Sequence, residues 1–293
     1  MAMGMPAALH SNPEEDKQMT KLSVELIDFT GAGSPDPARA AADLLVFTKQ
    51  TRLKMAQDQM DRVRAMSWEE LEAELTYMAN TIPSSWEFVD YTFLINNVTR
   101  AFTHQFVRTR TGSYAQQTMR VLDVNGWTYG TGPTIEADIE KNASEHIDEG
   151  VDGQPVAYGI DGLGPNAELY HDTMATVSAA YDELIEGGIA IEDARGILPT
   201  NIHTNIVAKF SLRTLADTAR KRASGRTQGE YRAVMEAMLG EVMRVHPWAS
   251  LFLERTFDKS AAELEAGIRE IYGLDPDEQT RLIKLVDQLR ATV

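Results

Sequence analysis

The stretch RTRTGSYAQQTMR, residues 108–120, places arginines at 108, 110 and 120 among serine, threonine and glutamine residues. Guanidinium groups brought this close repel one another unless an anion lies between them. Their planar, bidentate donors suit phosphate and carboxylate. The segment therefore predicts a site for a small anionic ligand. From composition alone, an exposed basic helix face paired with acidic residues is an equally good interpretation.

A second basic cluster lies further along the chain, where only Asp217 and Glu230 oppose it: Arg213, Arg220, Lys221, Arg222, Arg226 and Arg232. On a helix, Arg222 and Arg226 share a face with Thr218. Such a run is more often a solvated charged face than a binding site. Two independent basic clusters in an acidic chain nevertheless favour a bound nucleotide or polyphosphate.

The overall charge limits the kind of partner. The chain has 28 Lys+Arg against 44 Asp+Glu, a formal net charge of −16. A protein this acidic repels nucleic-acid backbones and anionic membranes, so we expect neither as a partner. Because the chain has no cysteine, disulfides and thiolate catalysis are excluded. No apolar run is long enough to span a membrane. Residues 1–20 are expected to form a mobile polar leader. The composition fits a cytoplasmic protein.

Several familiar sites are missing from the sequence. It contains neither a G-x-G-x-x-G pattern nor a P-loop, so a standard dinucleotide fold and a nucleotide triphosphatase are not indicated. Its 6 histidines lack metal-ligand spacing, so no metal site is expected.

The pattern of apolar residues predicts a single α+β domain over residues 21–293. Strands are expected at 21–30, 87–96 and 202–210. Helices are expected at 38–60, at 67–80 behind a Ser67 capping box, from Thr99 toward the arginine motif, and at 171–187 and 191–198. One or two more helices should cover 214–244, and a last one should follow Pro276. Residues 123–170 have little periodicity, apart from a short helical pattern at 135–147, and are expected to form an irregular insertion.

With its flanks, the arginine motif resembles flavin-dependent thymidylate synthases. That family carries Arg-His-Arg, a serine three residues on, a further serine and a closing arginine. The matching residues here are Arg108, Arg110, Ser113, Thr118 and Arg120. The resemblance covers roughly residues 20–260 outside the irregular middle. It also rests on residues 87–109 with Phe93, Ile95, Arg100 and Gln105, on 181–187 and 194–199, on Arg213 and Arg222, and on His246-Pro-Trp248.

The resemblance implies roles for individual residues. Nucleotide contacts would come from Gln105, Phe106, Val107, Arg108, Gln116, Gln117, Thr118, Met119 and Arg120, with Arg195 and Arg222 from a neighbouring subunit. Arg222 would be catalytic, because a guanidinium at the pyrimidine ring stabilises the negative charge that develops as C5 becomes nucleophilic. Flavin contacts would come from Ser84, Arg108, Thr109, Arg110, Gln116, Ser211, Leu212, Arg213 and Asp217.

The resemblance also implies a reaction and an assembly. The fold would be the α+β, mixed-sheet fold of that family, assembled as a homotetramer with flavin at the subunit interfaces. The activity would be C5-methylation of dUMP or UMP, with methylenetetrahydrofolate as carbon donor and NADPH-reduced FAD as hydride source. No cysteine nucleophile is needed for this chemistry.

The chain departs from the family at five positions around one pocket. Family histidines are replaced by Ile82, Phe88, Thr109 and Arg226, and a flavin-side asparagine is replaced by Asp217. Three alternatives therefore stay open. The enzyme could methylate or hydroxymethylate a cytidylate. The chain could bind nucleotide without catalysis, or it could be a helical interaction protein whose arginines are solvated.

Overall fold

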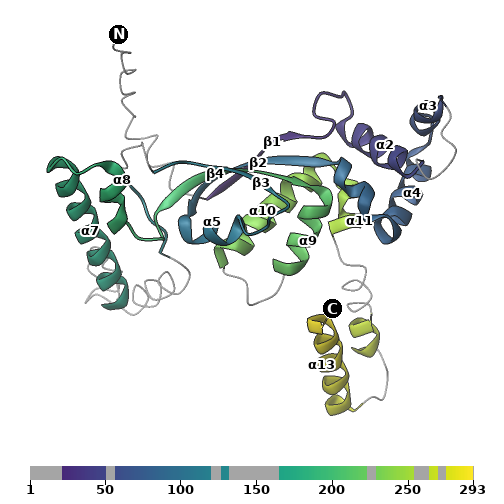
Figure 1. Cartoon of the computed structure of the whole chain (residues 1–293). Coiled ribbons are helices and arrows are strands. Elements are labelled where there is room, and N and C mark those ends of the chain that lie inside the picture. Colours follow the sequence, from purple (N-terminus) through teal and green to yellow (C-terminus); the bar gives the residue numbers. More distant parts are fainter. Residues whose placement is uncertain are drawn as a thin grey trace, which may run out of the picture. The chain divides into compact units, whose positions relative to one another are not determined.

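The computed structural model describes residues 22–50, 57–119, 127–131, 165–222, 229–253, 264–269 and 275–292 (Figure 1). The expected leader, the helical pattern at 135–147, Arg120 and Arg226 lie outside these residues. The chain divides into two compact units. Unit 1 comprises Met1–Ile27, Thr92–Lys209 and Arg226–Met238, and unit 2 comprises Asp28–Tyr91, Phe210–Gly225 and Leu239–Val293. The single domain expected over residues 21–293 stays a prediction.

Four strands form one sheet in the order β1-β2-β4-β3: β1 (Ser23–Phe29), β2 (Asp90–Thr99), β3 (Ser113–Gln116) and β4 (His203–Ser211). Burial alternates along β2 and β4, as expected when one face of a strand is covered. β3 pairs antiparallel with β4, with Ser113 opposite Lys209. The expected strands at 21–30, 87–96 and 202–210 are confirmed, except that residues 87 and 88 end the 3₁₀ helix η1 (Pro83–Phe88) instead. β3 was not predicted.

In addition to η1, unit 2 contains these described helices: α2 (Pro37–Gln50), α3 (Gln59–Arg64), α4 (Trp68–Thr81), α9 (Leu212–Arg222), η3 (Pro247–Ala249), α11 (Ser250–Leu253) and α13 (Pro276–Thr292). The Ser67 capping box is confirmed at the start of α4. The Glu70 amide donates to Ser67 Oγ at 3.2 Å, and the Ser67 amide donates to Glu70 Oε2 at 2.7 Å. The predicted pair of helices over 214–244 is also confirmed, as α9 and α10 (Gly229–Val245).

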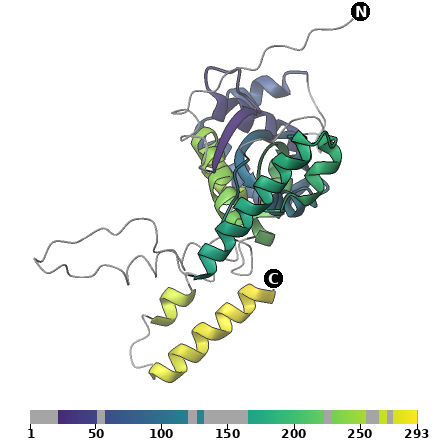
Figure 2. The ribbon, with the colours of Figure 1, turned by 90° about the vertical axis from the view of Figure 1, so that its left-hand side faces the viewer.

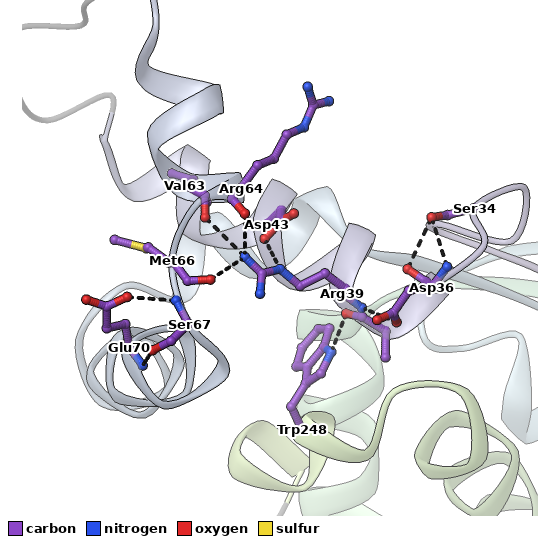
Figure 3. A network of polar contacts seen from close by, with 11 residues as sticks. Ser34, Asp36, Arg39, Asp43, Val63, Arg64, Met66, Ser67, Glu70 and Trp248 are labelled. Carbon is purple, nitrogen blue, oxygen red and sulfur yellow. Dashed lines mark hydrogen bonds and ion pairs between the residues drawn. The ribbon is translucent and has the colours of Figure 1, made fainter.

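A single helix over residues 38–60 is wrong, because α2 ends at Gln50 and α3 is a separate helix. Figure 3 shows what holds the two together. Arg39 of α2 donates through Nη2 to the carbonyls of Val63, Arg64 and Met66 at 3.3, 3.0 and 2.8 Å. Its Nε donates to Asp43 at 2.7 Å. Carbonyls at a helix end lack intrahelical partners, so Arg39 of α2 supplies donors to the carbonyls at the end of α3 and holds the two helices together.

Unit 1 contains α5 (Arg100–Phe106), α7 (Pro165–Glu186), α8 (Ile191–Ala194) and η2 (Arg195–Ile197), with the first part of α10. The irregular insertion is wrong at 165–170, because α7 begins at Pro165, a residue well suited to a first helical turn. Its predicted end is confirmed by Gly188, whose φ of 82° is left-handed. Phe102 and Phe106 of α5 stack at 4.9 Å, and Phe102 meets Tyr231 of α10 edge-on at 5.2 Å.

The last part of unit 2 is a small helical pair. Residues 264–269 lie beside α13 in both Figure 1 and Figure 2. Ile268 packs against Val286 and Ile283, and Gln279 donates to the carbonyl of Ile268 at 3.2 Å. None of the described helices combines the length and the apolar character that crossing a bilayer requires.

His246 is a fully buried titratable side chain of unit 2. Its Nδ1 lies 2.9 Å from the Tyr91 hydroxyl, and its ring stacks on Trp248 with centroids 5.2 Å apart. Burial lowers the pKa of His246 from 6.5 to about 4, while the nearby carbonyls of Pro37 and Thr30 oppose that shift. The fold therefore holds this imidazole neutral at physiological pH.

We predict that His246 makes the protein less stable in mild acid. The stabilisation is complete above pH 6.5, where the unfolded imidazole is also neutral. It is lost as the pH falls from 6.5 to about 4, because only the unfolded chain then binds the proton. At about 1.4 kcal/mol per tenfold change, the loss is on the order of 3 kcal/mol. Urea unfolding of wild type and His246→Gln between pH 7 and pH 4 measures it. His104→Gln, at an exposed histidine, should keep the wild-type dependence, and an unchanged slope in His246→Gln would contradict the assignment.

Candidate functional site

The start of α5 is fixed by hydrogen bonds from several parts of unit 1. Thr99 is the N-cap, and its Oγ1 accepts from the Phe102 amide at 3.1 Å. The amides of Arg100 and Ala101 donate to the carbonyls of Ile202 and Thr200 at 3.0 and 2.7 Å. The first amides of a helix have no intrahelical partners, and here distant carbonyls satisfy two of them. The backbone that carries Arg100 is therefore held in place by the segment that leads into β4.

Arg100 and Arg195 form a pair of like-charged groups in unit 1. Arg100 donates through Nη2 to the Gln117 carbonyl at 2.9 Å, and its buried Nε has no partner among the described residues. Arg195 donates through Nε to the Glu192 carbonyl at 3.1 Å. Burial, and then the charge of Arg195, lower the pKa of the Arg100 guanidinium. In the part of the chain that the structure describes, no carboxylate forms an ion pair with either arginine, so the pair suits an anionic ligand.

The first part of the arginine motif, residues 108–112, forms the turn between α5 and β3. The amides of Thr109 and Gly112 donate to the carbonyls of Phe106 and Thr109 at 3.1 and 3.0 Å. The Tyr114 hydroxyl lies 3.1 Å and 2.9 Å from the same two carbonyls. Burial raises the pKa of Tyr114 to about 12, so the hydroxyl stays a donor at neutral pH. The turn is well ordered by its own contacts, and it presents Arg108 and Arg110 as exposed side chains.

Unit 1 contains one part of the predicted site residues: Gln105, Phe106, Val107, Arg108, Thr109, Arg110, Gln116, Gln117, Thr118, Met119 and Arg195. Within this set, the Phe106 ring is fully buried in the core. Gln116 donates through Nε2 to Thr103 Oγ1 at 3.0 Å, and the Gln117 amide donates to the Asn205 carbonyl at 2.9 Å. The structure therefore places residues 116 and 117 beside α5 and β4.

Unit 2 contains the other predicted residues: Ser84, Ser211, Leu212, Arg213, Asp217 and Arg222. Glu87 connects two of them, because its carboxylate accepts from Ser211 Oγ at 2.7 Å and lies 3.6 Å from Arg213 Nη1. Leu212 is buried and its amide donates to the Val89 carbonyl at 2.7 Å. Asp217 pairs with Arg220 at 2.8 Å, so its charge is partly compensated. Arg222 ends α9 and is half-buried.

Ser84 lies on the wall of a cavity of about 260 Å³ in unit 2. The rest of the lining is mostly apolar and comes from α2, from η1 and from the residue between α4 and η1: Leu44, Phe47, Thr48, Ile82, Ser85 and Phe88. Ile82 and Phe88 stand where the resembling family has histidines. The cavity can therefore take a small apolar group beside the Ser84 hydroxyl, and its lining residues include no histidine.

Two residues of the site, Arg100 and Glu87, could not be assigned a role from the sequence alone. Both belong to the matching upstream block, but nothing in their spacing indicated Arg195 or Arg213 as neighbours. The one local signal was Thr99, whose N-cap position fixes which residue begins α5. Among the residues described, no cluster of His, Asp and Glu side chains could hold a metal ion.

A family model and individual relatives that match this chain all carry thymidylate synthase descriptions. The family model described as "Thymidylate synthase complementing protein" matches residues 25–248. A flavin-dependent thymidylate synthase of Clostridium tetani is 30% identical over 227 residues, covering 77% of this chain and 84% of that protein. One of Sulfurisphaera tokodaii is 29% identical over 229 residues, covering 77% and 75%.

A solved structure shares the fold. It is the crystal structure of a UMP/dUMP methylase, PolB from Streptomyces cacaoi, bound with 5-Br dUMP. The TM-score is 0.60 at 17% sequence identity, and the match covers 80% of this chain and 95% of that one. This supports the observed combination of a small sheet with many helices, and the α+β class expected from the sequence is confirmed.

Because no carboxylate of the described residues forms an ion pair with Arg100 or Arg195, we predict that inorganic phosphate stabilises the protein. Binding to the folded state alone raises stability by about 1.4 kcal/mol when the free ligand is tenfold above Kd. The midpoint temperature of thermal unfolding should be higher in phosphate than in chloride of equal ionic strength. Arg195→Gln should lose most of the difference. Arg62→Gln, at an exposed arginine paired with Asp58 on α3, should keep it. Equal phosphate stabilisation in Arg195→Gln and wild type would show that the anion binds elsewhere.

Proposed function

The chain belongs to the flavin-dependent thymidylate synthase family, and on that premise we propose that it methylates C5 of a uracil nucleotide, dUMP or UMP. The observation that carries the proposal is the Arg100–Arg195 pair, two guanidiniums without a carboxylate partner among the described residues. A nucleotide monophosphate brings a phosphate, and bidentate guanidiniums are strong partners for it. The PolB enzyme, which has the same fold, is a UMP/dUMP methylase, and this supports the choice of uracil as the base.

The donor set of unit 2 fits a flavin. Ser84 borders a mostly apolar cavity that can take a small apolar group. The Arg213 guanidinium and the Ser211 hydroxyl are oriented by one carboxylate, that of Glu87. FAD is the cofactor that the family implies, with NADPH as its reductant and methylenetetrahydrofolate as carbon donor. When bound, the reduced flavin supplies the hydride that completes the methyl group. The residues that would hold it are Ser84, Ser211, Leu212, Arg213 and Asp217, with Arg108, Thr109, Arg110 and Gln116.

In this proposal, some residues of the chain bind the phosphate and another activates the pyrimidine ring. Arg100 and Arg195 hold the phosphate, together with the arginine motif through Arg120. Arg222 faces the pyrimidine ring and stabilises charge that develops only as C5 becomes nucleophilic. An interaction that strengthens in the transition state raises kcat, whereas one that is equal in both states lowers KM.

We propose a homotetramer in which Arg195 and Arg222 of one subunit meet the arginine motif of a neighbouring subunit. Arg100 would then enter the shared site together with Arg195, because both belong to the same unit of one chain.

One observation favours a second candidate, a nucleotide-binding protein without turnover. Ile82 and Phe88 take the positions of family histidines and line the cavity beside Ser84. An apolar lining could hold a small apolar group and still lack a group needed for one-carbon transfer.

Release of tritium from C5 separates the two candidates. With FAD, NADPH and methylenetetrahydrofolate supplied, the enzyme should release tritium from [5-³H]dUMP or [5-³H]UMP, and more slowly from the matching cytidylates. Binding of dUMP without release would support the second candidate. Preference for dCMP or CMP would overturn the choice of base, and failure to bind any flavin would overturn the enzyme.

Substitutions should separate activation from binding. Arg222→Ala should lower kcat by on the order of 100-fold, because it removes transition-state stabilisation. Arg195→Ala should mainly raise KM, because the phosphate is held equally in both states. Steady-state kinetics at saturating cofactor measures both effects. Equal, modest effects of the two substitutions on kcat and KM would contradict these roles.

A further inference from the structure

Glu230, in the first turn of α10, uses both of its carboxylate oxygens on one residue of unit 1. Its Oε1 accepts from the Thr99 amide at 2.7 Å, and its Oε2 accepts from the Thr99 hydroxyl at 2.6 Å. Thr99 is the N-cap of α5 and immediately precedes Arg100. A single carboxylate thus joins the start of α10 to the residue that sets where α5 begins. No local pattern indicates this contact, since the two residues are 131 positions apart.

Thr99 has little freedom to move within this arrangement. Gly130 approaches it so closely that a Cβ at position 130 would lie 2.7 Å from Thr99 Cγ2. The Gly130 amide is itself held by the Asn201 carbonyl at 2.9 Å. His203 lies nearby, with Nδ1 2.9 Å from Thr128 Oγ1. Burial lowers the pKa of His203, and the charge of Glu230 partly opposes this. Thr99 is therefore enclosed on one side and bonded to a carboxylate.

The arrangement leaves the charge of Arg100 available. Hydrogen bonds from Thr99 occupy both Glu230 oxygens. Burial and the charge of Arg195 act on the Arg100 guanidinium, and no carboxylate of the described residues is among these influences. Arg100 and Arg195 repel each other, so Arg100 would relax away from Arg195 if its backbone were free. A fixed backbone opposes that movement before an anion is bound.

We propose that Glu230 is a positioning residue for the nucleotide phosphate: by bonding the N-cap Thr99, it holds Arg100 beside Arg195 in the geometry that binds an anion. The proposal rests on the proposed function, because it takes the phosphate of a uracil nucleotide as the ligand of the pair. Preorganised donors bind without spending free energy on rearrangement. Loss of the carboxylate should therefore weaken binding of the phosphate and leave binding of the base and sugar unchanged.

The test compares dUMP with deoxyuridine, which lacks the phosphate, by calorimetric titration. In Glu230→Gln, the affinity for dUMP should fall about tenfold, the equivalent of about 1.4 kcal/mol. The affinity for deoxyuridine should change less than twofold, a factor worth about 0.4 kcal/mol. The matched control is Glu236→Gln, which removes the same charge at an exposed position of the same helix and should behave as wild type. Thr99→Val removes the hydroxyl bond to Glu230 and also the N-cap bond from the Phe102 amide, and it should give a loss of the same kind. Thr99→Ser should retain wild-type affinity.

A double-mutant cycle shows whether Glu230 acts through Arg100. In an Arg100→Ala background, Glu230→Gln should cause no further loss of dUMP affinity. Equal losses for dUMP and deoxyuridine, or a full additional loss in the Arg100→Ala background, would show a merely structural role and overturn the proposal. If Glu230→Gln fails to fold, Thr99→Val decides by the same comparison. If wild type itself binds dUMP no better than deoxyuridine, the proposed function fails, and this outcome is distinct from failure of the positioning role.

Discussion

The repulsion between Arg100 and Arg195 is the interaction on which the proposed anion site of unit 1 depends. The charge of Arg195 is close enough to lower the pKa of Arg100, and no carboxylate among the described residues neutralises either group. Such a pair persists only where the backbone holds it. Carbonyls at positions 200 and 202 bond the first turn of α5, and the Gln117 carbonyl accepts from the Arg100 guanidinium. The fold thus maintains a local concentration of positive charge.

The positive charge of this site contrasts with the acidic character of the whole chain. A net charge of −16 disfavours extended polyanions, so a small anion entering a confined basic site is the partner that fits both facts. In unit 2, by contrast, carboxylates lie beside the arginines of the candidate flavin site. There Glu87 accepts from Ser211 and lies beside Arg213, and Asp217 pairs with Arg220. Carboxylates therefore orient the guanidiniums of Arg213 and Arg220, whereas the described residues give no carboxylate partner to Arg100 or Arg195.

Local patterns in the sequence predicted the elements they encode. The Ser67–Glu70 capping box, the left-handed Gly188, the aromatic and β-branched run that became β2 and the apolar run that became β4 all depend on neighbours a few residues apart. The separate helix α3 was not predicted, and its end is held to α2 by Arg39, which lies 24 to 27 positions away in the sequence. β3 escaped because it is short, and its pairing with β4 is a long-range contact.

The same limit applies to the candidate site: its local motif could be predicted from the sequence, and its long-range contacts could not. The arginine motif drew attention to residues 108–120, and the structure places Arg108 and Arg110 on an exposed turn. Arg100 stands outside that motif, and its relation to Arg195 depends on how α5 and η2 approach each other within unit 1. Spacing along the chain does not carry that information. The contact between Glu230 and Thr99 is of the same kind, since it joins two helix starts through a side chain.

Mass spectrometry of the reaction product tests the central claim most directly. The protein is incubated with FAD, NADPH, a uracil nucleotide and methylenetetrahydrofolate labelled with deuterium on its methylene carbon. The account predicts a nucleotide that gains one methyl group at C5, with both deuterium atoms of the donor retained in that methyl. Unchanged nucleotide under conditions where FAD and dUMP are both bound, or a product that carries a hydroxymethyl group, would contradict it.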